Sequence, residues 1–127
     1  MLIRLAGAAA FLYHGSQILF GAFGGPGPEG FAKFMHLPAF IGVLVGIGEF
    51  GGGLSYLTGV LTRIGASGIG VIMVGAILLV HLKNGFSIAN NGFEYPLTQL
   101  LIALALMIRG AGSYSLNIFL KNKKVET

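Results

Sequence analysis

The chain contains no cysteine and no aspartate, and only 9% of its 127 residues are charged. Without cysteine, the chain can form no disulfide, present no thiolate nucleophile and bind no iron–sulfur cluster through cysteine ligands. Any redox chemistry must therefore come from a bound molecule or from a partner protein. Soluble domains carry about a quarter charged residues. This chain cannot cover itself with polar groups, so lipid must be part of its solvent.

Hydrophobic residues make up 54% of the sequence, and the mean hydropathy is +0.83. About 20 apolar residues suffice to cross a bilayer, and the short links between the apolar segments favour antiparallel neighbours. We therefore predict an all-α membrane protein, a four-transmembrane-helix antiparallel bundle that forms a single domain over residues 1–127. The predicted spans are residues 2–23, 38–61, 64–82 and 94–109, followed by a basic tail at 110–127.

The connections between the predicted spans carry strong helix-breaking signals. The glycine- and proline-rich residues 24–30 cannot continue the first helix, and residues 31–36 are predicted to form a short interfacial piece that ends before Pro38. Thr62 and Arg63 are predicted to form a tight turn between the second and third spans.

The basic residues are unevenly distributed over the two ends of the predicted bundle. Lys33 and Lys83 lie at one end, whereas six of the eight lie at the end with both termini: Arg4, Arg63, Arg109, Lys121, Lys123 and Lys124. The positive-inside rule then predicts cytoplasmic termini. We expect a multi-pass protein of a bacterial or archaeal plasma (inner) membrane. Its C-terminal lysines are expected to contact anionic lipid and not nucleic acid, for which no fold signature is present.

A single carboxylate, Glu49, lies near the middle of the second predicted span. An ionised or unpaired carboxylate is most costly at that depth, so such a residue usually faces the bundle interior and has a partner. His14 falls at a similar depth in the first span, and Arg4 is the alternative partner. Glu49 is either a polar clamp that specifies packing or part of a quinone, proton or substrate site.

A second pair of ionisable residues, His81 and Glu94, lies near the outer face, where the third span ends and the fourth begins. An imidazole and a carboxylate there could exchange protons with a quinone headgroup. Alternatively, His81 anchors the chain at the interface and Glu94 complements the dipole of the fourth helix. Haem ligation by His36 and His81 is possible on depth alone, but it is disfavoured because the loop with His36 gives no sign of a rigid helix pair. The His and Glu spacings predict no metal site.

Five segments, taken in order, resemble the DoxX family of small four-helix membrane proteins. These segments are Arg4, residues 11–15, residues 49–54 with 59–63, residues 93–97 and residues 109–116. The resemblance implies a four-span bundle with the Glu49 motif in the second helix and Glu94-Tyr95 opening the fourth. It also implies redox-linked biology, because the family is named for its association with thiosulfate:quinone oxidoreductase and other members are linked to membrane thiol and oxidative-stress systems.

We therefore predict an integral membrane subunit of a redox-linked complex. We expect the subunit to carry no covalent cofactor and to lie next to a quinone. Whether the subunit itself is catalytic is left open. Glu49 and His14 would form the polar core, and His81 and Glu94 would line an outer quinone or proton site. One alternative is a purely structural subunit that docks on a larger assembly, or on a second copy, through glycine-rich faces. Another is a small transporter, although four short helices leave little room for alternating access.

Overall fold

The computed structural model describes residues 1–119, and no strand occurs within that range. Its main helices are α1 (Leu2–Phe20), α2 (Gly27–Phe34), α3 (Ala39–Thr58), α4 (Thr62–Ala76) and α5 (Glu94–Arg109). Two helical stretches are long and apolar enough to cross a membrane, namely Ala39–Thr58 and the continuation of α4 through further turns, Thr62–Asn84. The prediction of an all-helical fold is confirmed for residues 1–119, which contain two candidate membrane spans, whereas four spans remain a prediction.

Two boundary predictions are corrected by backbone conformation. Thr62 and Arg63 are not a turn but the first residues of α4, because the chain reverses just before them, at Gly59 (φ 76°) and Leu61 (φ 51°). The interfacial helix α2 begins at Gly27 and not at residue 31, with a proline in its first turn. Proline is favoured there, because the first N–H groups of a helix have no partner within it.

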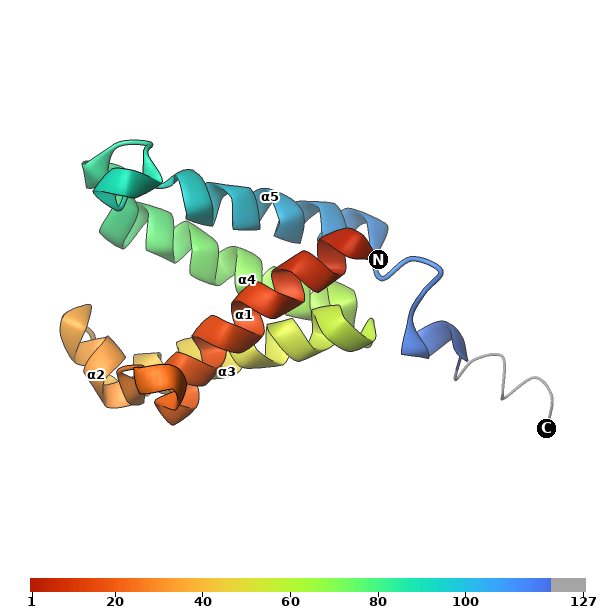
Figure 1. Cartoon of the computed structure of the whole chain (residues 1–127), viewed down its shortest axis with the longest axis horizontal. Helices are drawn as coiled ribbons and strands as arrows, with labels where there is room; N and C mark the ends of the chain where they lie inside the picture. The colour runs from red at the N-terminus through yellow and green to blue at the C-terminus, as the bar shows by residue number, and fades with distance from the viewer. Residues whose placement is uncertain (120–127) are drawn as a thin grey trace.

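The helices form two groups that meet at one end and diverge at the other (Figure 1). α3 packs against α1 on one side and α4 on the other, α5 lies alongside α4, and α2 lies across α3. The groups diverge at the end that carries α2 and the loop of residues 82–93. The N-terminus lies at the opposite end, near the end of α5.

Glycines allow the close approach of α1, α3 and α4. A Cβ atom at Gly53 would lie 2.8 Å from the backbone nitrogen of Leu12 in α1. On the other side of α3, a Cβ at Gly52 would lie 2.5 Å from the side chain of Ile69 in α4. Lipid supplies no hydrophobic driving force between helices, so close packing of this kind holds them together.

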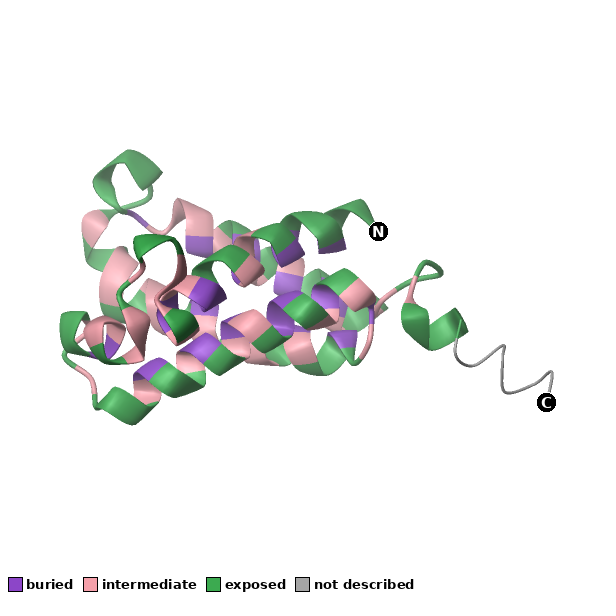
Figure 2. Ribbon diagram, turned by 60° about the horizontal axis from the view of Figure 1, so that its bottom comes forward, coloured by how far each residue is buried: buried purple, intermediate pink, exposed green. Residues whose placement is uncertain are grey.

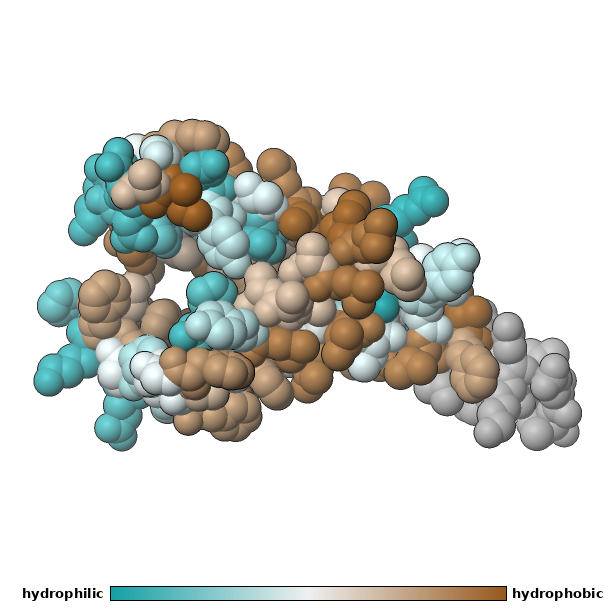
Figure 3. Space-filling model, in the orientation of Figure 1, coloured by the Kyte–Doolittle hydropathy of each residue, from teal (hydrophilic) through white to brown (hydrophobic). Residues whose placement is uncertain are grey.

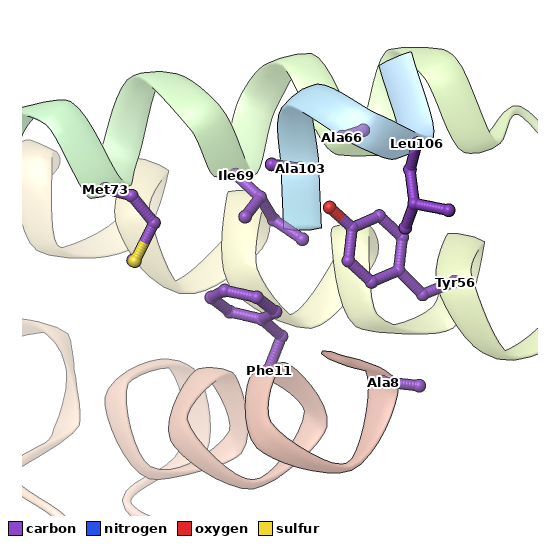
Figure 4. Packing of buried hydrophobic residues seen from close by; sticks show 8 residues of the cluster. All are labelled: Ala8, Phe11, Tyr56, Ala66, Ile69, Met73, Ala103 and Leu106. Atoms are coloured by element: carbon purple, nitrogen blue, oxygen red, sulfur yellow. The ribbon is translucent and has the colours of Figure 1, made fainter. Parts of the chain in front are cut away.

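The hydrophobic core lies where α1, α3, α4 and α5 meet (Figure 4). At its centre the rings of Phe11 and Tyr56 meet edge to face at 6.1 Å. Figure 2 shows buried residues on the faces between helices and exposed residues on the outer faces. Many of the exposed residues are large and apolar, such as Val71 at 74% and Ile108 at 80% exposure. An outer surface of this kind fits lipid better than water.

Candidate functional site

A cavity of about 800 Å³ occupies the diverging end of the bundle. It is lined by residues of α1, α2, α3, α4 and α5 and of the loop after α4. Figure 3 shows the molecule hollowed at this end, between α2 below and the loop above. Most of the lining is apolar, and the polar side chains within it are His14, Glu49, His81, Asn91 and Tyr95. The cavity thus brings together three of the four residues predicted from the sequence.

Glu49 lies on the buried face of α3 and borders the cavity. Its side chain is only 7% exposed, and its Oε2 atom has no hydrogen-bond partner among the described residues. The buried face consists otherwise of Gly42, Gly46, Gly52, Gly53 and Tyr56. Because these residues lie three, four or seven positions from residue 49, helical periodicity turns Glu49 inward with them. Buried polar atoms are normally paired, so the free carboxyl oxygen requires an explanation.

The predicted contact between His14 and Glu49 does not form, since no hydrogen bond or ion pair joins them in the structure of residues 1–119. His14 is exposed to the cavity, and its ring lies 6.0 Å from that of Tyr95. Glu49 and Tyr95 line the same cavity. The ring nearest to His14 in this cavity is therefore contributed by α5, whereas Glu49 comes from α3.

Arg4 is excluded as the partner of Glu49, because its guanidinium is fully engaged at the other end of the bundle. Its Nε donates to the carbonyl of Tyr56 at 2.7 Å and its Nη2 to that of Leu57 at 3.1 Å. Its Nη1 donates to the carbonyls of Ala111 at 2.8 Å and Tyr114 at 2.6 Å. The first two carbonyls belong to the last turn of α3, where unpaired carbonyls and the helix dipole favour a cation.

His81 is positioned by a π-helical turn, Ile77–His81, that continues α4. Such turns are rare and are often found at functional sites. The Nδ1 atom of His81 lies 2.8 Å from the carbonyl oxygen of Asn91, which also accepts a bond of 3.1 Å from Asn84. A carbonyl can only accept, so in the neutral ring Nδ1 carries the proton and Nε2 is left as an acceptor.

Glu94 does not line the cavity. Its Oε2 accepts a hydrogen bond of 2.9 Å from the backbone N–H of Ile88, and no hydrogen bond or ion pair joins it to His81 in the described part of the chain. Glu94 is also the first residue of α5, where negative charge suits the helix dipole. Its contacts therefore favour the structural alternative, in which Glu94 orders the loop and the start of α5.

Tyr95 is the cavity residue that sequence reasoning missed. Tyr95 and Gln99 are four positions apart and so share one face of α5. A pair of polar residues on one face of a short apolar helix indicates that this face is turned inward, and that signal was available in the sequence. His36 does not line the cavity, and residues 1–119 contain no group of three or more metal-ligating side chains.

The fold and cavity define an all-helical membrane protein with an internal pocket that is open at one end. The sequence model of the DoxX family matches residues 1–82, and the chain belongs to that family. The matched region contains His14, Glu49 and His81, whereas Glu94 and Tyr95 lie beyond it. The chain is also 33% identical over 63 residues to an uncharacterized protein of Haemophilus influenzae. That match covers 50% of this chain and 42% of the relative's length. No solved structure matches the chain.

Proposed function

We propose that this DoxX-family protein is an integral membrane subunit of a redox-linked complex and that its cavity holds the headgroup of a quinone. The observation that carries the proposal is Glu49, which lines a large and mostly apolar cavity and has a buried carboxyl oxygen without a hydrogen-bond partner among residues 1–119. A buried unpaired carboxyl group is costly. A ligand with a polar headgroup would satisfy it.

The residues present fit a quinone. A volume of about 800 Å³ lies within the range of pockets that bind small molecules, roughly 300 to 1,000 Å³. The apolar walls suit an isoprenoid tail, and His14, Glu49, His81 and Tyr95 offer polar groups to the head. Bound quinone would supply the electron-transfer chemistry that the chain lacks without cysteine. The chain's own residues would bind the head, orient it, and hold or release protons at Glu49 and the two histidines.

The proposed topology has four spans, formed by α1, α3, α4 with its continuation, and α5. Arg4 and Arg63 cap the carbonyl ends of α3 and α5 at one end of the bundle, since Arg63 donates to Ile108 at 3.2 Å. The positive-inside rule makes that end cytoplasmic. The cavity then opens at the outer face of a plasma membrane. The C-terminal lysines at 121, 123 and 124, which are predicted to contact anionic lipid, lie outside the described residues.

The test is purification in mild detergent followed by solvent extraction and identification of the bound small molecules. We expect about one quinone, in its oxidised or reduced form, per protein in the wild type and little in Glu49→Met, which removes the polar group. Glu29→Met is the matched control, because Glu29 is an exposed carboxylate of α2 outside the cavity. If the wild type carried only phospholipid, or if both variants lost quinone equally, the proposal would be refuted.

A second candidate function is that of a docking subunit without a ligand. A shallow apolar groove of about 450 Å³ runs between α3 and α4 on the outer surface. Gly51 and Gly68 line it, and a Cβ atom added at either would meet no atom within 4 Å. This groove suits an apolar transmembrane helix of a partner protein. The wild type would then co-purify with a partner and with lipid but no quinone, and Gly51→Leu with Gly68→Leu would release the partner.

A further inference from the structure

We infer that the cavity selects the reduced, hydroxyl-bearing form of its ligand, a quinol, over the oxidised quinone. The inference rests on the proposed function, because it assumes that a molecule of the quinone type occupies the cavity. The two forms differ sharply in hydrogen bonding. A quinol carries two O–H groups that donate, whereas the two carbonyl oxygens of a quinone only accept. The hydrogen-bonding groups of the cavity therefore decide which form binds more tightly.

At the buried wall, the group that needs a partner is Glu49. Its carboxyl oxygen Oε2 is enclosed and has no protein donor within residues 1–119. A carboxylate only accepts hydrogen bonds, and a protonated carboxyl group still accepts at its carbonyl oxygen. Glu49 can thus accept an O–H from a ligand in either state. A hydrogen bond between a hydroxyl and an ionised carboxylate is also among the stronger ones in proteins.

Toward the loop, the group that needs a partner is His81. Its Nδ1 is committed as the donor to the Asn91 carbonyl at 2.8 Å, which leaves Nε2 of the neutral ring as an acceptor. His81 comes from the continuation of α4 and Glu49 from the middle of α3, so the two acceptors lie on different walls of one cavity. A quinol has two hydroxyl groups on opposite sides of its ring, one for each acceptor.

The other polar side chains of the cavity do not reverse this preference. No lysine, arginine or tryptophan, the side chains that can only donate, lines the cavity within the described residues. His14 and Tyr95 can donate or accept, and Asn91 is exposed at the loop. Beside an ionised Glu49, the oxidised quinone would therefore find no obligate donor, and the carboxylate would repel its carbonyl oxygens.

The experiment is an anaerobic calorimetric titration of the purified full-length protein in detergent with decylubiquinol and with decylubiquinone. We expect the quinol to bind at least about tenfold more tightly, which corresponds to ~1.4 kcal/mol. Glu49→Gln introduces an N–H donor at the same place, so the ratio should fall toward one. Glu29→Gln should leave the ratio unchanged. His81→Phe removes the second acceptor, while the Asn91 carbonyl keeps its bond from Asn84, so this variant should lower the ratio without relying on the Glu49 variant to fold.

The outcomes separate this inference from the function on which it rests. Equal binding of the two forms, or tighter binding of the quinone, overturns the preference and leaves the proposed function intact. Binding of neither form refutes the proposed function itself. An unchanged ratio in both folded variants, Glu49→Gln and His81→Phe, overturns the assignment of the acceptors. A thermal melting curve that matches that of the wild type establishes that a variant is folded.

Discussion

Arg4 is expected to be the most sensitive residue for stability outside the cavity. Its side chain is 3% exposed, and its guanidinium makes four hydrogen bonds to backbone carbonyls. Two of these carbonyls, of Tyr56 and Leu57, end α3, and two, of Ala111 and Tyr114, belong to the segment that follows α5. Arg4 thus ties the start of α1 to the end of α3 and to the C-terminal segment.

Arg4→Met keeps a long apolar side chain and removes all four donors. A hydrogen bond contributes about 1 kcal/mol net to stability, so we expect the free energy of unfolding to fall by roughly 4 kcal/mol. Arg4→Lys should recover only part of the loss, because an ammonium group cannot reproduce the planar fork of donors. The carbonyl of Tyr114 should also be released, which exposes the chain there to chymotrypsin.

The assays are denaturant unfolding in detergent and limited chymotrypsin digestion read by mass spectrometry. Arg109→Met is the matched control, because Arg109 is an exposed arginine at the end of α5 and its loss should change the free energy by less than about 0.5 kcal/mol. If Arg4→Met were no more destabilising than this control, or if cleavage at Tyr114 did not increase, the assigned role of Arg4 would be refuted.

Other predictions follow from the helix contacts and from the loop. Gly53→Ala should destabilise the protein, because its Cβ would lie 2.8 Å from the backbone nitrogen of Leu12. Gly68→Ala, where the Cβ meets open space, should instead stabilise the protein by about 0.5 to 1 kcal/mol in denaturant unfolding. Glu94→Ala removes the acceptor for the Ile88 N–H and should increase hydrogen exchange at Ile88 without changing quinone content. A loss of bound quinone in Glu94→Ala would contradict the placement of Glu94 outside the cavity.

Much of the fold was predictable because the apolar segments are long and their breaks carry glycine or proline. The α5 prediction, residues 94–109, matches the helix Glu94–Arg109. The error at Thr62 and Arg63 arose because the reversal uses left-handed conformations at Gly59 and Leu61. Leucine gives no signal for such a conformation, which is uncommon for residues other than glycine.

The candidate site was predictable in part of its residues but not in their pairing. Depth along the chain placed His14 with Glu49 near the middle of the bundle and His81 with Glu94 near its outer face, and the cavity contains the first three of these residues but not Glu94. Depth does not specify the direction of a side chain around its helix. The ring of His14 therefore meets Tyr95 and not Glu49. The engagement of Arg4 with carbonyls of the C-terminal segment depends on tertiary contacts across more than a hundred residues, which no local pattern encodes.

The central claim is that Glu49 serves a ligand and not the fold, and the most direct measurement compares wild type with Glu49→Met. Both proteins would be assayed for bound quinone and for the free energy of unfolding after the ligand is removed. Because the Glu49 Oε2 atom is buried without a partner, the account predicts that Glu49→Met loses the quinone but is at least as stable as the ligand-free wild type. Retention of quinone, or a clear loss of stability in the ligand-free variant, would contradict it.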